Sequence, residues 1–241
     1  MSTDPRYYDV VAATWPPAET STLGAVTIRD GQGGGSRVSA ATASEALTDA
    51  DLQAAEAAMR RLGQSPLFMI RDGDVGLDAQ LDAQGYQVKD PVSLWSCPAA
   101  QLTDIPIPRV TTFVMWQPLA IIREIWIAGG IDPSRQAIME RVSGPKTAIL
   151  GRFNDKPAGA GFCAIHDGIA MVHALEILPH QRRNGMGAWM MRQAAFWALE
   201  NGADELTVLC TKRNEAANGL YASLGMACVG EYHYRILPNG D

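Results

Sequence analysis

The chain has 241 residues, a mass of 25.9 kDa and a formal net charge of −6. This length allows one large domain or two small ones, and the acidic balance argues against general nucleic-acid binding, which needs a basic surface. The cysteines show no CxxC or CxxH spacing, so the sequence indicates neither a disulfide framework nor a zinc site. Reduced, buried thiols are expected at Cys97, Cys163, Cys210 and Cys228. No targeting segment and no apolar run as long as a membrane span are recognised, so we expect a cytoplasmic protein.

The first half contains a glycine run at 31–35 between two strand-like stretches, LGAVTIR and SRVSAATA. We interpret this run as a hairpin tip, because no helix is predicted to start directly after it. The spacing of TDADLQAAEAAMRRLG, residues 48–63, predicts a helix. The stretch 97–110 is proline-containing and weak in helix or strand signals. We therefore predict an N-terminal domain at 1–97, a linker at 98–107 and a second domain at 108–241.

The second half predicts helices at 118–130 and 133–142, followed by three strands joined by tight turns. A longer helix follows, with Met186, Met190, Ala194 and Trp197 on one stripe and Asn201-Gly202 as the stop signal. A buried strand ELTVLCT, a short helix NEAANGLYASLG and a last strand MACVGEYHYRI end the chain. This order predicts an α/β or α+β layer.

The two halves show a weak internal repeat. An offset of 140 residues aligns Gly85 with Gly225 and sets LFMIRDGDVGLDAQLDAQGY against TVLCTKRNEAANGLYASLGM without a gap. The predicted helix at 48–63 then falls opposite GAWMMRQAAFWALENG. The first half has no counterpart of the polar turn QRRNGMG at 181–187.

That turn joins a predicted strand to a helix N-terminus, where free backbone N–H groups and the helix dipole favour an anion. Gly185 and Gly187 let the backbone approach the ligand closely, and Arg182 and Arg183 add positive charge. Helix capping alone also accounts for a lone Gly-x-Gly turn, so the rest of the sequence must decide between capping and anion binding.

In that context the second half resembles the GNAT superfamily of N-acetyltransferases. The segment Arg182-Arg183-Asn184-Gly185-Met186-Gly187 meets the family's acetyl-CoA signature. A second family motif is met by Asn214, Ala217, Leu220, Tyr221 and Gly225, with Met226 in place of phenylalanine. The resemblance covers residues 108–236 and implies a mixed, mostly antiparallel sheet flanked by helices. The first half looks like a smaller, degenerate GNAT-like copy.

The resemblance implies direct transfer of an acetyl group from acetyl-CoA to an amine, with no metal. The residues that it assigns to the coenzyme are Ile177, Leu178, Arg182, Arg183, Asn184, Gly185, Met186, Gly187, Ala188, Asn214, Ala217 and Tyr221. The expected partner is a small-molecule or peptide amine, with no nucleic acid or membrane, and self-association would take the form of a homodimer. The alternative is a non-catalytic, regulatory protein that binds acyl-CoA.

Three side chains are candidates for acid and base chemistry. In an ideal strand Met171, His173, Leu175 and Ile177 share one face, so His173 is the first candidate base, and a histidine at this register is similar to that of the arylalkylamine N-acetyltransferases. Glu176 faces the other way unless a bulge reverses the alternation. Tyr221 is the candidate acid for the departing thiolate. Packing in the core is the alternative for His173 and Tyr221.

Overall fold

The computed structural model describes residues 3–238. Its helices are α1 (Arg6–Thr14), α2 (Ser36–Ser39), α3 (Asp49–Arg61), α4 (Val75–Ala83), α5 (Ala120–Ala128), α6 (Pro133–Arg141), α7 (Met186–Glu200) and α8 (Glu215–Ser223), with short 3-10 turns at Ala99–Leu102 and Pro179–Gln181. Its strands are β1 (Glu19–Leu23), β2 (Val26–Asp30), β3 (Thr42–Ala43), β4 (Leu67–Arg71), β5 (Gln87–Pro98), β6 (Thr112–Met115), β7 (Lys146–Phe153), β8 (Lys156–His166), β9 (Ile169–Ile177), β10 (Glu205–Thr211) and β11 (Ala227–Ile236).

One large sheet joins the two halves of the chain. Its eight strands follow the order β4-β11-β5-β10-β9-β8-β7-β6, and most neighbours are antiparallel. The pair β9 and β10 is parallel. A separate three-stranded sheet, β1-β2-β3, lies in the first half. This is the mixed, mostly antiparallel α+β fold that the sequence predicts.

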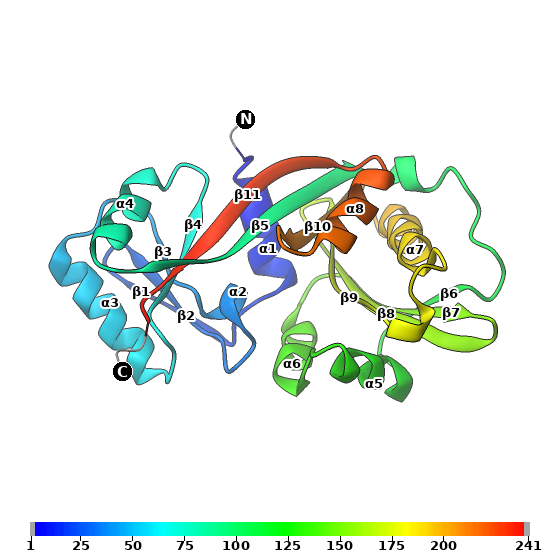
Figure 1. The fold of residues 1–241 in the computed structure, drawn as a ribbon, viewed down its shortest axis with the longest axis horizontal. Helices are drawn as coiled ribbons and strands as arrows, with labels where there is room; N and C mark the ends of the chain where they lie inside the picture. Colours follow the sequence, from blue (N-terminus) through cyan, green and yellow to red (C-terminus); the bar gives the residue numbers. More distant parts are fainter. Residues whose placement is uncertain (1–2, 239–241) are drawn as a thin grey trace.

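The last strands of the two halves are exchanged between them. β5 ends the first half yet pairs with β10 of the second half, while β11 ends the chain yet pairs with β4 of the first half. β5 and β11 also pair with each other, and Figure 1 shows both running along the top of the molecule from one half to the other. Each half therefore completes the other's part of the sheet.

The internal repeat is visible in the order of elements. β4, α4 and β5 are followed at the 140-residue offset by β10, α8 and β11, and both α4 and β5 begin 140 residues before their counterparts. α3 takes the place of α7 in this comparison. The division at residues 97 and 107 remains a prediction, and the shared sheet shows that the strands on either side of it depend on each other.

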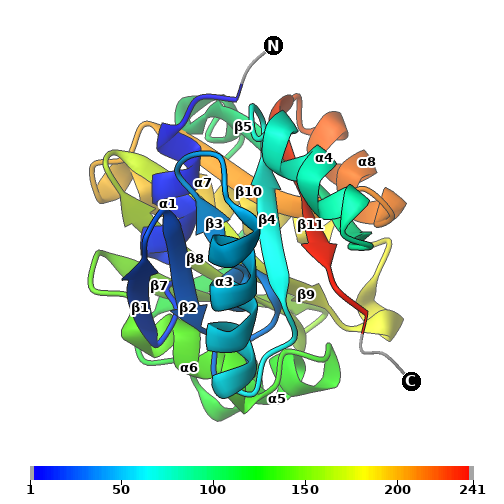
Figure 2. The ribbon, with the colours of Figure 1, turned by 90° about the vertical axis from the view of Figure 1, so that its left-hand side faces the viewer.

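Helices cover both faces of the second half's strands. α7 and α8 pack on one face, where Met190, Met191 and Ala194 are buried among the side chains of β8, β9 and β10. α5 and α6 pack on the other face, around the fully buried Trp126 and Phe162. In the first half, α3 and α4 cover a separate core, and Figure 2 shows α3 in front of that half's strands.

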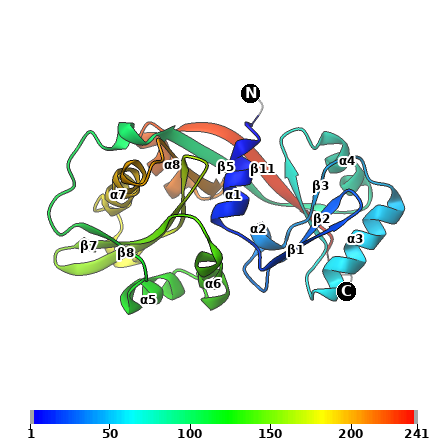
Figure 3. The ribbon, with the colours of Figure 1, turned by 180° about the vertical axis from the view of Figure 1, so that it is seen from behind.

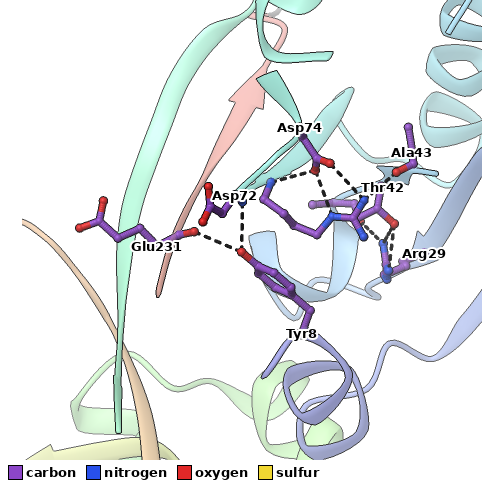
Figure 4. Close-up of polar contacts among 9 residues, drawn as sticks. Tyr8, Arg29, Thr42, Ala43, Asp72, Asp74 and Glu231 are labelled. Carbon is purple, nitrogen blue, oxygen red and sulfur yellow. Dashed lines mark hydrogen bonds and ion pairs between the residues drawn. The ribbon is translucent and has the colours of Figure 1, made fainter. Parts of the chain in front are cut away.

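The N-terminal helix α1 lies at the junction of the two halves, as the view from behind shows (Figure 3). Its Val10 and Val11 pack with Ile169 and Met171 of β9. Its Tyr8 hydroxyl donates to the carbonyl oxygen of Glu231 in β11 at 3.3 Å and accepts from the Asp72 backbone N–H at 3.1 Å. Figure 4 shows these contacts beside the Arg29 and Asp74 contacts of the first half. Thus α1 packs on β9 of the second half while it bonds to Asp72 of the first half.

Three sequence expectations are wrong. A short helix, α2, does start directly after the glycine run, and of the predicted strand SRVSAATA only Thr42–Ala43 is extended. The edge strand β6 was not predicted, because its four residues lie in a stretch with no clear alternation. Cys228 is exposed, whereas the other three cysteines are buried.

Candidate active site

The site lies where β9 and β10 separate. The two strands pair only from Ile169 to Val172 and from Glu205 to Val208, although both continue further. Beyond this point one edge of β9 has no strand partner, and a cavity of about 250 Å³ opens between the strands. It is lined by Arg37, Val172, His173, Ala174, Leu175, Val208, Leu209, Cys210, Thr211, Asn214, Ala217 and Tyr221. An extended, amide-containing ligand can use the free strand edge for hydrogen bonds.

A β-bulge lies at this point of β9. Ala174 has a φ of +51°, and the register with β8 shifts between Phe162↔His173 and Ala160↔Glu176. The bulge contradicts the predicted alternation: Leu175 packs on the α7 side, whereas His173 packs beside Phe162 on the opposite face. His173 therefore does not share a face with Leu175 and Ile177, and Glu176 lies on the same side as His173.

The turn before α7 presents free backbone donors. The N–H groups from Arg183 to Ala188 have no hydrogen-bond acceptor within residues 3–238. Gly185 at the N-cap has a φ of +74°, in the left-handed region that favours glycine. Unpaired donors at the start of a fifteen-residue helix form an anion-binding site. Such an arrangement can accept a phosphate group.

The individual residues of this turn have different surroundings. Arg182 folds back onto β9, donating to the Ile177 carbonyl and to Glu176 Oε1, both at 3.0 Å. Arg183 is exposed and makes no ion pair with another described residue. The Met186 side chain is buried in the core, so only its backbone faces the site. A Cβ on Gly187 would lie 2.9 Å from Leu220 Cδ2, so this glycine permits close packing of α7 on α8.

Both ring nitrogens of His173 are engaged. Arg37 Nη1 lies 3.0 Å from Nδ1, and Thr14 Oγ1 lies 2.8 Å from Nε2 and donates to the Val10 carbonyl at 2.6 Å. Because arginine has only donors, Nδ1 must accept and the ring proton must sit on Nε2. Burial and the charge of Arg37 hold the pKa of His173 well below its usual value. The histidine is thus neutral, with no free lone pair for an amine proton.

Tyr221 and Asn214 enter the cavity from the α8 side. Tyr221 is 4% exposed, and burial raises the pKa of its phenol, so the hydroxyl keeps its proton. No other described side chain or backbone group hydrogen-bonds to this hydroxyl. Asn214 caps α8 through its side-chain oxygen, which accepts from the Ala217 N–H at 3.2 Å. The buried phenol is therefore available as a proton donor.

Glu176 does not line the cavity between β9 and β10. Its carboxylate is held by Arg182, and its side chain packs against the end of α5, where a Cβ on Gly129 would lie 2.5 Å from Glu176 Cγ. Lys212 and Arg213, which follow β10, are also paired, with Glu231 and with Asp90 respectively. Glu176, Lys212 and Arg213 are thus each paired with another charged group, whereas Arg183 has no such partner within the described chain.

The sequence did not reveal the part of the site that comes from the first half. Trp15 stacks on the His173 ring with 4.9 Å between centroids, and Arg37 bonds to the same ring from α2. α2 has only four residues, too few for a periodic pattern, and the glycines before it read as a flexible turn. The only available signal was the arginine two residues after the glycine run.

Comparison with known proteins agrees with this geometry. Residues 116–226, within the second half of the chain, match the family model described as "Acetyltransferase (GNAT) family". The chain is 26% identical over 236 residues to the "Uncharacterized N-acetyltransferase YobR" of Bacillus subtilis (strain 168), covering 94% of this chain and 96% of that protein.

Solved structures share the fold over both halves. A GCN5-related N-acetyltransferase from Kribbella flavida superposes with a TM-score of 0.71 and 18% identity, covering 100% of this chain and 97% of that one. A "Tandem GNAT protein from the clavulanic acid biosynthesis pathway (without AcCoA)" superposes with a TM-score of 0.65 and 11% identity, covering 99% and 90%. At these identities the likeness concerns the fold alone.

Within residues 3–238, no group of three or more His, Cys, Asp or Glu side chains is arranged to hold a metal ion. Within the same range, no helix is long and apolar enough to cross a bilayer.

Proposed function

We propose that this protein transfers an acetyl group from acetyl-CoA directly to an amine. One observation carries the proposal: the turn at 183–188, whose backbone N–H groups are unpaired, lies beside the unpaired edge of β9. That edge borders the cavity lined by Tyr221. The turn suits the pyrophosphate, the unpaired edge of β9 suits the amide groups of the pantetheine arm, and the cavity suits the thioester. The family of the second half supports acetyl transfer in general, and the proposal adds the donor and the acceptor.

Tyr221 is proposed as the general acid. The nitrogen lone pair of the free amine attacks the thioester carbon, the C–S bond breaks, and the thiolate takes the proton of the Tyr221 hydroxyl. The proton lost by nitrogen leaves through water in the cavity and restores the phenol. The unpaired N–H groups at the bulged edge of β9 are the candidate donors to the oxygen that becomes negative during attack.

His173 is proposed as a positioning residue. Its two nitrogens hold Arg37 and Thr14, so it fixes the wall of the cavity supplied by the first half. Glu176 is proposed to orient Arg182 at the end of β9. Neither group has to accept the amine proton in this mechanism, since the proton lost by nitrogen passes through water to the Tyr221 phenolate.

A thiol-release assay tests the proposal. The full chain is incubated with acetyl-CoA and a panel of primary amines, and free coenzyme A is measured over time. We expect release that depends on the amine and yields the N-acetylated product. Tight binding of acetyl-CoA without any release across the panel would favour the alternative, a regulatory protein that binds acyl-CoA.

A further inference from the structure

A second cavity lies at the junction of the two halves. It has a volume of about 320 Å³, near the lower end of the range for small-molecule sites. The first half contributes Trp15, Gly34, Gly35, Ser36, Arg37, Asp90 and Val92, and the second half contributes Ile131, Arg135, Ala174, Thr211, Arg213, Tyr232 and Tyr234. Because no single half encloses this space, the cavity exists only in the joined molecule.

This junction cavity adjoins the cavity between β9 and β10. Arg37, Ala174 and Thr211 line both spaces. Ala174 is the bulged residue of β9, and Thr211 is the last residue of β10, so the shared boundary lies where these strands separate. A molecule held in the junction cavity therefore lies next to the place where the acetyl group would be presented.

The charges in the junction cavity are unbalanced. Three arginines, Arg37, Arg135 and Arg213, face one carboxylate, Asp90, which is paired with Arg213 at 2.9 Å. Arg37 and Arg135 have no carboxylate partner within residues 3–238. This concentration of positive charge is notable in a chain with a net charge of −6. Two unmatched guanidinium groups create a local preference for an anion.

Arg37 also has unused hydrogen-bonding capacity. Its Nε is buried and has no hydrogen-bond partner in the described chain. Its Nη1 is fixed by His173, and its guanidinium carbon lies 5.8 Å from the centre of the Trp15 ring. A buried donor without a partner costs free energy unless a ligand or water satisfies it. The arginine is thus held in place by two contacts, and its Nη2, which makes no hydrogen bond to another described residue and is not closed off from solvent as Nε is, is the donor that can reach a ligand.

Aromatic groups form the rest of the wall. Trp15, Tyr232 and Tyr234 are buried, and the Tyr234 hydroxyl donates to the Tyr232 hydroxyl at 3.4 Å. These rings supply apolar contact area and hydroxyl groups beside the arginines. The lining therefore suits a small molecule with an anionic end and an apolar body.

We propose that the junction cavity binds the acceptor amine through an anionic group on it, a carboxylate or a phosphonate, held by Arg37 and Arg135. This inference rests on the proposed function, because it identifies the cavity as the acceptor site of the same reaction. It assigns a role to the first half, which supplies Arg37 and Trp15. The amine nitrogen then lies toward Ala174 and Thr211, where the two cavities meet.

Matched acceptors test the anionic requirement. The full chain is assayed with the proteinogenic L-amino acids and their C-terminal amides, and with β-alanine and 2-aminoethylphosphonate as a carboxylate and phosphonate of similar length. We expect kcat/KM for the best acid to exceed that of its amide by about ten- to hundredfold, the range of a charge-assisted hydrogen bond. Relative rates of β-alanine and 2-aminoethylphosphonate identify which anion is preferred. Equal rates for acids and amides would overturn the proposal.

Variants locate the anion. Arg37→Gln and Arg135→Gln should each lower the acid-to-amide ratio by at least about tenfold, and Arg135→Gln should leave the Kd for acetyl-CoA unchanged. Arg61→Gln at the exposed end of α3 is the matched control and should keep the ratio. Arg135 is exposed, so its substitution keeps the test valid if Arg37→Gln does not fold. A ratio that survives the Arg135 substitution, and the Arg37 substitution where it folds, would overturn the assignment.

Calorimetry separates this inference from the proposed function. Binding of the preferred acid to the full chain is measured without acetyl-CoA, and acetyl-CoA binding is measured alone. Binding of acids but not their amides, lost in Arg135→Gln, supports the anion site even if no transfer occurs. Acetyl transfer to neutral amines only would support the proposed function and overturn this inference.

Discussion

Nη1 of Arg37 lies 3.0 Å from Nδ1 of His173, and this contact joins a helix of the first half to the bulged strand of the second half. The donor is an arginine, so the contact exists only while the histidine is neutral. The Nε2–H of His173 donates a hydrogen bond to Thr14 Oγ1, and the Thr14 hydroxyl donates to the Val10 carbonyl. Protonation of this one buried ring would therefore break the Arg37 contact between the two halves at the site.

Replacing His173 should change how stability depends on pH. The folded pKa lies well below the unfolded value near 6.5, so below that pH the unfolded chain binds a proton that the folded chain does not. Stability then falls with decreasing pH, by up to about 1.4 kcal/mol per pH unit for this one group. In His173→Gln this contribution should disappear, as measured by urea unfolding between pH 5 and 7.5.

His166→Gln is the control for this measurement. His166 is exposed at the β8–β9 turn, so its replacement should leave the slope of unfolding free energy against pH unchanged. An unaltered slope in His173→Gln would contradict a buried neutral histidine.

Removing the Tyr221 hydroxyl should slow turnover. Tyr221→Phe keeps the buried ring and removes the proposed proton donor, so we expect kcat to fall by about 10²-fold or more while acetyl-CoA affinity changes little. Tyr8→Phe removes a hydroxyl that bonds to β11 outside both cavities and should leave kcat unaltered. Steady-state kinetics and calorimetry on each variant decide the matter. An unchanged kcat in Tyr221→Phe would mean that the thiolate leaves without this acid.

The two arginines of the turn before α7 should contribute differently to coenzyme binding. Arg183→Gln removes an exposed charge that is free to meet a phosphate, and we expect the Kd for coenzyme A to rise about three- to tenfold at low salt. Arg182→Gln should have a smaller effect, because the guanidinium is already bound to Glu176 and Ile177. Added salt should reduce the difference in the Kd for coenzyme A between wild type and Arg183→Gln.

Arg109→Gln, in the exposed stretch between the halves, is the control for coenzyme binding. A larger effect of Arg182→Gln than of Arg183→Gln would show that Arg182 leaves Glu176 when the coenzyme binds.

Separating the halves should unfold both. β5 lies between β10 and β11, so a fragment of residues 106–241 lacks a central strand of its sheet, and a fragment of 1–105 lacks β11 beside β4. We expect neither fragment alone to show a cooperative thermal transition, and the two co-expressed fragments to purify together and to unfold in one transition. Circular dichroism measures this. A folded, coenzyme-binding 106–241 fragment would contradict the interdependence.

The sequence predicted most of the second half because its elements carry strong local signals. The long helix α7 has a clear apolar stripe and a stop signal, and the repeat at 140 residues predicted that α4 and β5 correspond to α8 and β11. The spacing of glycines at 185 and 187 correctly placed the strand-to-helix turn. Local patterns suffice where neighbouring residues determine the structure.

The errors arise where long-range contacts determine the structure. The bulge at Ala174 is a property of the β8–β9 register, and no pattern within β9 indicates it. The Arg37 contact spans 136 residues, and the strand exchange joins segments from opposite ends of the chain. The sequence repeat shows that the halves correspond, but it contains no information on which half each strand pairs with.

The position of β11 affects how the protein is made. β4 and β5 leave the ribosome well before β11, the strand that lies between them. Until β11 is synthesised, both strands have unpaired edges that can pair with other chains. Emergence of β11 is thus the step that closes this part of the sheet, and a chain that lacks Ala227–Ile236 would leave β4 and β5 without the strand that joins them.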